Sequence, residues 1–132
     1  MKIGFTCSTF DLFHPGHIMM LKEAKTQCDY LIVGLQSDPT IDRPETKNKP
    51  VQTLFERYIQ LDACKYVDEI IPYESEKELM TILQNNNIDI RILGDEYKNK
   101  VFTGCNLDME YHFNKRTHKY SSSELRKRLR TI

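Results

Sequence analysis

The sequence predicts an α/β domain built on a five-stranded, mostly parallel sheet with helices on both faces. Short apolar runs alternate with longer segments whose apolar residues recur at helical spacing. Several of the short runs are continuously apolar, which is typical of strands buried on both faces. The chain has 132 residues, enough to bury one core but too few for two. We therefore expect a single domain over residues 1–132.

The first three elements form a strand–helix–strand unit. We expect strands at residues 2–7 (KIGFTC) and 29–36 (DYLIVGLQ), with a helix over residues 17–28 between them. The apolar positions of this helix are Ile18, Leu21, Ala24 and Cys28. Residues 36–52 follow with three prolines and no hydrophobic period, so they predict a long loop of functional importance or high mobility.

Two helices in the middle of the chain carry capping signals. The helix expected over residues 53–67 starts at Thr53, and Glu56 follows at the spacing of a capping box. The helix expected over residues 75–86 starts at Ser75, with Glu78 at the same spacing. Leu54, Tyr58, Leu61 and Cys64 share one face of the first of these helices.

The remaining segments complete a doubly wound order. Strands are expected at residues 68–73, 88–94 and 108–113, a second loop at about 95–107, and a last helix at 121–130. Parallel strands require crossover connections, and here the crossovers are helices, so the order predicts a Rossmann-like, doubly wound sheet. In such sheets ligands bind beyond the carboxyl ends of the strands.

Composition excludes several classes of function. The chain has 19 basic and 19 acidic residues, so no global field recruits nucleic acid or a membrane. The basic run ELRKRLR near the end predicts a solvated helix face. No run approaches ~18 apolar residues, and the four cysteines form no C-x-x-C pair. We expect a cytoplasmic protein that binds neither nucleic acid nor membrane.

The stretch CSTFDLFHPGH, residues 7–17, contains the candidate phosphate-binding residues. It lies where the first strand ends and the first helix begins, a place where free N–H groups and the helix dipole favour a phosphate. Pro15 suits a helix entry, and Gly16 lets a ligand approach the backbone. His14 and His17 face the same way around that turn and form a clamp for a polyphosphate. The alternatives are two structural histidines or a zinc pair, although helical zinc pairs are usually four residues apart.

This stretch resembles the signature of the cytidylyltransferase-like nucleotidyltransferases, TFD-x-x-H-x-G-H, at residues 9–17. Three further stretches resemble the family in the same order: ERYIQLDACKYVDEIIP, LGDEY and RTHKYSSSELR. Within the family, the chain most resembles the glycerol-3-phosphate cytidylyltransferases, over nearly its whole length. The likeness departs from them at Ser8, Lys65, Tyr97 and the serine triplet at 121–123.

The resemblance implies an enzyme that joins CTP to glycerol 3-phosphate and releases CDP-glycerol and pyrophosphate, for teichoic acid or capsule synthesis. It implies Mg²⁺ carried by the triphosphate rather than by protein side chains, and a homodimer. Alternative substrates are ATP, or another phosphorylated small alcohol such as phosphocholine, phosphoethanolamine or a sugar phosphate. An alternative of another class is a nucleotide-binding module without turnover.

The resemblance also implies roles for individual residues. The expected catalytic residues are His14, His17, Lys47, Lys49 and Arg116, with one of the two lysines closing onto the α-phosphate. The expected nucleotide-binding residues are Thr9, Phe10, His14, Gly16, His17, Gly94, Asp95, Arg116, Thr117, Ser121 and Ser122. The expected acceptor-binding residues are Asp38, Arg57, Lys65 and Tyr97. Asp11 is expected to organise the turn, because a triphosphate repels a carboxylate.

Overall fold

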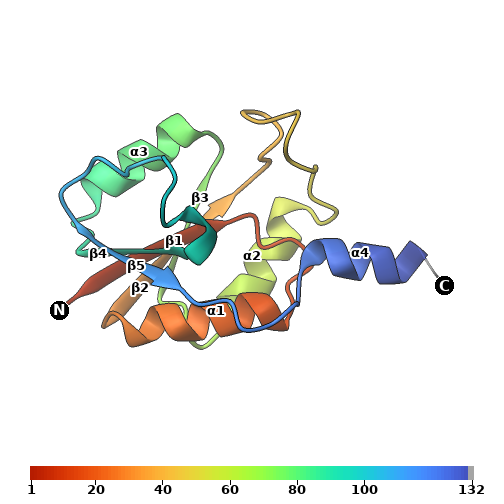
Figure 1. The fold of residues 1–132 in the computed structure, drawn as a ribbon, viewed down its shortest axis with the longest axis horizontal. Helices are drawn as coiled ribbons and strands as arrows, with labels where there is room; N and C mark the ends of the chain where they lie inside the picture. Colours follow the sequence, from red (N-terminus) through yellow and green to blue (C-terminus); the bar gives the residue numbers. More distant parts are fainter. Residues whose placement is uncertain (131–132) are drawn as a thin grey trace.

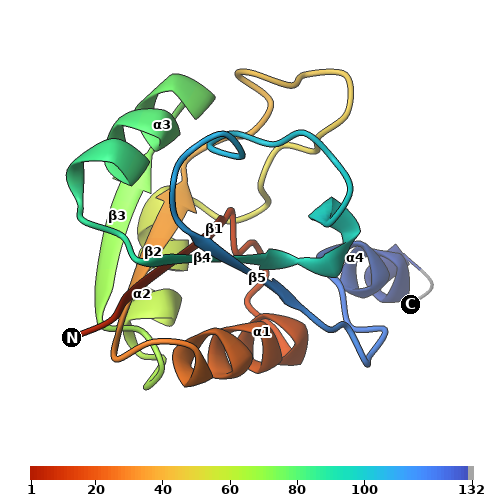
Figure 2. The same ribbon diagram turned by 60° about the vertical axis from the view of Figure 1, so that its left-hand side comes forward.

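The computed structural model describes residues 1–130, and its centre is one five-stranded sheet in the order β3-β2-β1-β4-β5. The strands are β1 (Ile3–Ser8), β2 (Tyr30–Gln36), β3 (Glu69–Tyr73), β4 (Ile90–Gly94) and β5 (Glu110–Asn114). All four strand pairs are parallel. The predicted fold class is therefore confirmed, and the direction of strand order reverses between β1 and β4 (Figures 1 and 2).

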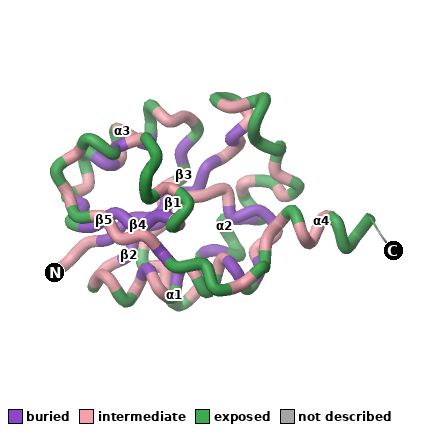
Figure 3. The backbone as a smooth tube through the Cα atoms, in the orientation of Figure 1, coloured by how far each residue is buried: buried purple, intermediate pink, exposed green. Residues whose placement is uncertain are grey.

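Helices cover both faces of the sheet. The helices are α1 (Pro15–Thr26), α2 (Leu54–Asp62), α3 (Glu76–Asn85) and α4 (Ser122–Arg130). Leu21 of α1 and Leu61 of α2 belong to one core cluster, and Leu79 of α3 belongs to another on the opposite face. The buried strands lie between these two layers (Figure 3). Helix α4 projects from the body and contains no buried residue (Figure 1).

Both predicted N-cap residues cap their helices, and one of the two predicted capping boxes is formed. Thr53 Oγ1 accepts the Glu56 N–H and the Glu56 carboxylate accepts the Thr53 N–H, so the predicted capping box is formed. Ser75 Oγ likewise accepts the Glu78 N–H at the start of α3. The Glu78 carboxylate, however, accepts the N–H of Glu74 rather than that of Ser75. Residues 37–52 contain turns but no helix or strand, as predicted.

Some boundaries differ from the prediction. Helix α2 ends at Asp62 and not at residue 67, because the chain turns back there to bring β3 alongside β2. That turn is fixed by the carboxylate of Asp68, which accepts the Leu31 N–H at 2.8 Å. Helix α1 starts at Pro15 and ends before Cys28, and Ile18 on it is 40% exposed.

The link between β4 and β5 contains no long crossover helix. It begins with a 3₁₀ turn, η1 (Asp95–Tyr97), and continues as a loop that returns the chain to the start of β5. The Tyr111 hydroxyl holds this loop by donating to the carbonyls of Gly104 and Leu107. The loop thus lies beyond the carboxyl end of β4 (Figure 2).

Candidate active site

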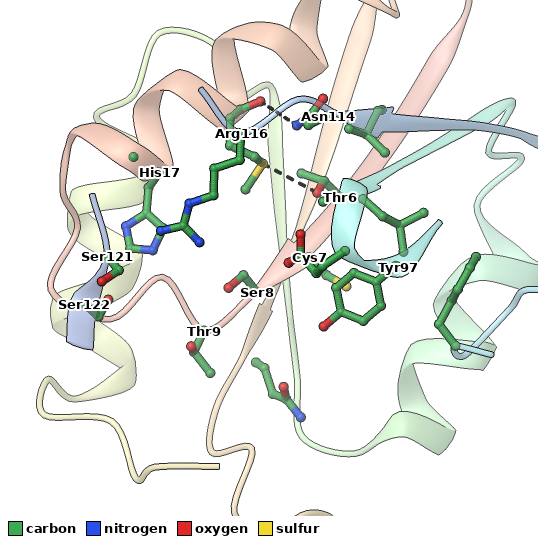
Figure 4. A pocket seen from close by; sticks show the side chains of 18 of the residues that line it. Thr6, Cys7, Ser8, Thr9, His17, Tyr97, Asn114, Arg116, Ser121 and Ser122 are labelled. Atoms are coloured by element: carbon green, nitrogen blue, oxygen red, sulfur yellow. Dashed lines mark hydrogen bonds between the residues drawn. The ribbon is translucent and has the colours of Figure 1, made fainter. Parts of the chain in front are cut away.

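A large pocket opens at the carboxyl ends of β1 and β4, the point at which the strand order reverses. Its volume is about 850 Å³. Ser8 at the end of β1 and Gly94 at the end of β4 both line it. Figure 4 shows His17, Arg116, Ser121 and Ser122 on one side, with Cys7 and Tyr97 on the other. Ligands of doubly wound sheets bind at this position, so the pocket is the candidate active site.

The turn between β1 and α1 has an unusual backbone. Phe10 and Leu12 have φ angles of 50° and 53°, in the left-handed region that non-glycine residues seldom adopt. Burial of the Phe10 side chain and hydrogen bonds accepted by Asp11 hold the turn in place. The Asp11 carboxylate accepts the N–H groups of Val51 (2.8 Å) and Gln52 (3.0 Å). Asp11 therefore organises the turn, as predicted, and also joins it to the end of the proline-rich loop.

His14 and His17 cap α1 with their own rings. His14 is the N-cap residue, and its Nδ1 accepts the Gly16 N–H at 3.0 Å. The His17 Nδ1 accepts the His14 N–H at 3.2 Å. The two rings stack with their centroids 3.8 Å apart. Because each Nδ1 is an acceptor, each neutral ring carries its proton on Nε2. Both histidines are therefore available as Nε2–H donors.

Burial keeps these two rings uncharged at neutral pH. It lowers the pKa of His17 to about 3, and the adjacent His14 ring acts in the same direction. Burial also lowers the pKa of His14, with further lowering from His118 and Arg116. Neutral donors stabilise the charge that develops on a phosphate without the cost of burying two imidazolium ions.

The start of α4 completes this side of the pocket. Ser122 Oγ donates to the carbonyl of Asp11 at 2.7 Å, which attaches α4 to the first turn. Ser121 Oγ accepts the Glu124 N–H at 3.0 Å. Arg116 donates through Nη2 to the Tyr120 carbonyl at 2.6 Å. We call His14, His17, Arg116, Ser121 and Ser122 the histidine half of the pocket; Thr117 and Gly16 line it as well.

The opposite wall comes from other segments. Its residues, which we call the arginine half, are Cys7, Tyr73, Arg91, Tyr97, Phe102 and Thr103. Burial raises the pKa values of Cys7 and Tyr73, so both side chains are neutral. Tyr97 was predicted, but Arg91 was not. The signal for Arg91 was available in the sequence, because a charged residue interrupts the apolar strand IDIRILG.

The structure separates the two lysines of the proline-rich loop. Lys47 lines the pocket, whereas Lys49 does not. Arg43 of the same loop, which we did not predict, also lines the pocket and pairs with Glu76 at 3.0 Å. Thr9 and Gly94 line the pocket as expected for a nucleotide site. Asp95 and the buried Phe10 side chain do not line it.

The expectation that Arg57 faces an acceptor phosphate is wrong. Arg57 is 2% exposed, and its guanidinium binds backbone carbonyls inside the protein. Its nitrogens donate to the carbonyls of Thr9 (2.9 Å), Gln36 (2.6 Å), Ser37 (2.6 Å) and Gln52 (3.2 Å). Arg57 therefore fastens both ends of the proline-rich loop to the first turn.

Two other residues expected to bind the acceptor lie outside the pocket. Lys65 follows α2, near the amino end of β3, and its ammonium group lies 5.4 Å from the centre of the Tyr66 ring. Because the pocket is at the carboxyl ends of the strands, Lys65 is at the wrong end of the sheet. The Asp38 carboxylate accepts hydrogen bonds from the N–H and hydroxyl of Thr40, and Asp38 does not line the pocket.

Residues 1–130 contain neither a membrane-spanning helix nor a cluster of metal-binding side chains. None of the helices in this part of the chain is both long and apolar enough to cross a bilayer. No three His, Cys, Asp or Glu side chains in the same range come together as a metal site would require.

The comparisons with known proteins agree with this geometry. A family model described as "Cytidylyltransferase-like" matches residues 5–128. "Bifunctional protein HldE" of Campylobacter jejuni is 39% identical over 108 residues, which is 80% of this chain and 23% of that protein. The protein of the same name from a Caulobacter species is 32% identical over 84% of this chain and 22% of its own length. The chain thus spans less than a quarter of these relatives.

Solved structures share the fold. A lipopolysaccharide core biosynthesis protein from Thermoplasma volcanium superimposes with a TM-score of 0.63 at 24% identity, over 99% of this chain and 88% of that one. A pantoate-beta-alanine ligase from Francisella tularensis gives a TM-score of 0.63 at 16% identity, over 99% and 70%. At these identities the likeness establishes the architecture alone.

Proposed function

The chain belongs to the cytidylyltransferase-like family, and from that premise we propose that it transfers a cytidylyl group from CTP to glycerol 3-phosphate. The products are CDP-glycerol, a precursor for cell-surface polymers, and pyrophosphate. The observation that carries the nucleotidyl transfer is the pair of neutral Nε2–H donors on His14 and His17 at the start of α1. The choice of CTP and glycerol 3-phosphate rests on the resemblance of the four motifs.

In the proposed reaction a phosphate oxygen of the acceptor attacks the α-phosphorus of CTP. The bond between that phosphorus and the oxygen leading to the β-phosphate breaks, and pyrophosphate leaves on the opposite side. His14 and His17 donate to the phosphate oxygens on which charge accumulates. Arg116 and the start of α4 hold the β- and γ-phosphates, and Lys47 approaches the α-phosphate as a point charge.

In the proposed reaction the metal ion would be bound by the triphosphate and not by protein side chains. The histidine half offers imidazole, hydroxyl and guanidinium groups and no carboxylate, whereas Mg²⁺ prefers oxygen ligands and often binds through substrate phosphates. A Mg²⁺ ion bound to the triphosphate would neutralise charge on the leaving pyrophosphate. The protein's own residues position the phosphates and donate hydrogen bonds to them.

The test is pyrophosphate release in the presence of Mg²⁺. Each of CTP, ATP, GTP and UTP is combined with glycerol 3-phosphate, phosphocholine, phosphoethanolamine and sugar phosphates. We expect turnover with CTP and glycerol 3-phosphate. Turnover with ATP, or with CTP and another acceptor, would retain the reaction type and replace the substrate. Nucleotide binding without turnover on any pair would support the binding module instead.

We further propose that the protein works as a homodimer in the cytoplasm. Helix α2 carries an exposed apolar face that includes Phe55 (71% exposed) and Ile59 (52% exposed), one turn apart. A face of this kind is suited to a contact between two copies. Size-exclusion chromatography with light scattering should give twice the 15.6 kDa mass. A monomer at micromolar concentration would contradict the proposal.

A further inference from the structure

Arg91 is a buried cation that forms no ion pair with a carboxylate of residues 1–130. It lies on β4, is 4% exposed, and lines the pocket. Its guanidinium donates to the Thr103 carbonyl, lies 4.0 Å from Cys7 Sγ, and stacks 5.1 Å from the centre of the Phe102 ring. Within residues 1–130 it forms no ion pair with any Asp or Glu. Within the described part of the chain, its positive charge is therefore not neutralised by an ion pair.

The neighbours of Arg91 do not remove this charge. Burial raises the pKa of the Cys7 thiol, so Cys7 is not an anion at neutral pH. The Glu76 carboxylate, which lines the same pocket, is already bound by Arg43 at 3.0 Å and by Thr103 Oγ1 at 3.0 Å. Burying an unpaired charge is costly, and such a charge in a pocket is commonly matched by an anionic ligand.

The surrounding chain is built around the guanidinium. Gly104 has a φ of +87°, a conformation that favours glycine, and a Cβ at this position would lie 2.8 Å from Arg91 Nη1. The Tyr111 hydroxyl fixes the loop by donating to the carbonyls of Gly104 and Leu107. Phe102 and Tyr111 also pack edge to face, with ring centroids 5.7 Å apart. The loop between β4 and β5 therefore holds Arg91 in one orientation.

We propose that Arg91 binds the anionic phosphate of the acceptor, and that the arginine half of the pocket is the acceptor subsite. This inference rests on the proposed nucleotidyl transfer. In an in-line displacement the nucleophile and the leaving group lie on opposite sides of the α-phosphorus. The histidine half holds the triphosphate and its leaving pyrophosphate, so the acceptor approaches from the opposite wall. Arg91 takes the role that the sequence had suggested for Arg57 and Lys65.

Two substitutions at Arg91 and one matched control test this role. Arg91→Met removes the charge and keeps an unbranched apolar side chain, whereas Arg91→Lys keeps the charge and loses the planar fork. Lys98→Met makes the same change in net charge on an exposed residue of the same loop that does not line the pocket. For each protein, KM is measured separately for glycerol 3-phosphate and for CTP.

We expect Arg91→Met to raise the KM for the acceptor about 10- to 100-fold, the effect of losing a charged hydrogen bond. The KM for CTP should change by less than about threefold, and Arg91→Lys should recover part of the loss. Lys98→Met should behave like the unsubstituted protein. An unchanged acceptor KM in Arg91→Met, or an equal loss for CTP and acceptor, would overturn the proposal.

A binding measurement keeps this test separate from the proposed reaction. Calorimetric titration with glycerol 3-phosphate, and with inorganic phosphate, requires no turnover. Suppose that no substrate pair reacts, but that glycerol 3-phosphate or phosphate binds to the unsubstituted protein and binds more weakly to Arg91→Met. The acceptor subsite is then supported, and the proposed nucleotidyl transfer is not. If the enzyme turns over and Arg91→Met binds both compounds as tightly as before, the subsite is wrong. Should Arg91→Met fail to fold, Arg91→Lys decides the question by the same two measurements.

Discussion

The two halves of the pocket offer different kinds of group to a phosphate. The histidine half uses neutral imidazole donors at the start of α1, together with groups at the start of α4. The arginine half uses Arg91, whose charge is buried on β4 and forms no ion pair within residues 1–130. Both histidines of the first arrangement belong to one short motif, whereas the second arrangement combines segments from β1, β3, β4 and the following loop. The difference predicts that the halves respond differently to substitution and to pH.

The largest expected effect is that of His14→Ala on turnover. The substitution removes one Nε2–H donor from the histidine half, and losing a single transition-state donor costs about 10²–10³ in kcat. It also removes the N-cap of α1, worth about 1 kcal/mol of stability. Steady-state kinetics, with circular dichroism to confirm folding, measures both effects.

His112→Ala is the matched control for this substitution. His112 pairs with Glu23 at 2.8 Å and does not line the pocket. Its loss should change kcat by less than about threefold, because it removes one hydrogen bond of a half-buried side chain outside the pocket. A fall of less than about tenfold in folded His14→Ala would mean that the histidine half does not stabilise the transition state.

The sequence predicted the two halves unequally, and the reason is physical. His14, Gly16 and His17 are close in the chain, and a strand-to-helix turn brings nearby residues together whatever the rest of the fold does. Arg91 meets Cys7 and Phe102 only after the sheet and the loop have formed. The order of helices and strands along the chain, the N-cap residues and the proline-rich loop followed from hydrophobic period and turn chemistry, which are also local.

Arg57 shows the limit of assigning roles from residue type. An arginine that follows a proline-rich loop suits a phosphate ligand, and nothing local indicates that four backbone carbonyls will surround it. The burial of this guanidinium depends on how residues 36–52 fold back over the first turn. The acceptor-binding role expected for Lys65 does not fit its position for a related reason. That position relative to the pocket depends on where α2 ends.

Arg57→Leu should therefore lower the stability of the protein. It should also loosen the first turn, on which the two histidines of the histidine half depend. Removing a buried group with several charged hydrogen bonds leaves carbonyls without partners and should lower the free energy of unfolding by about 2–3 kcal/mol. Urea denaturation measures this loss. Arg43→Leu provides the comparison, since its partly exposed pair with Glu76 should contribute less than about 1 kcal/mol. Equal stability of Arg57→Leu and the unsubstituted protein would contradict the structural role.

The two loop lysines should differ in a smaller effect on rate. Lys47 lines the pocket and Lys49 does not, although both belong to the same loop. Lys47→Met should lower kcat about tenfold, equivalent to about 1.4 kcal/mol of transition-state binding. Lys49→Met changes net charge equally and should leave kcat within about twofold. If Lys49→Met were the slower variant, the loop would have to close on the nucleotide in another arrangement.

The smallest expected effect is a pH dependence of stability that comes from the histidine half. The pKa of His17 falls from its usual 6.5 to about 3 in the folded protein, because the ring is buried beside His14. Between these values the unfolded chain binds a proton that the folded protein excludes, so stability decreases as the pH falls below 6.5. From pH 7 to pH 6 the expected loss is about 0.7 kcal/mol.

Comparison with His17→Asn isolates this contribution. Asn cannot titrate, so urea denaturation of the variant should lose about 0.7 kcal/mol less than the unsubstituted protein between pH 7 and pH 6. The lowered pKa of His14 acts in the same direction and is present in both proteins. Identical slopes would mean that His17 is protonated in the folded state at pH 6. The rings at the start of α1 would then be charged at this pH, and they would not be the neutral Nε2–H donors that the proposed reaction uses.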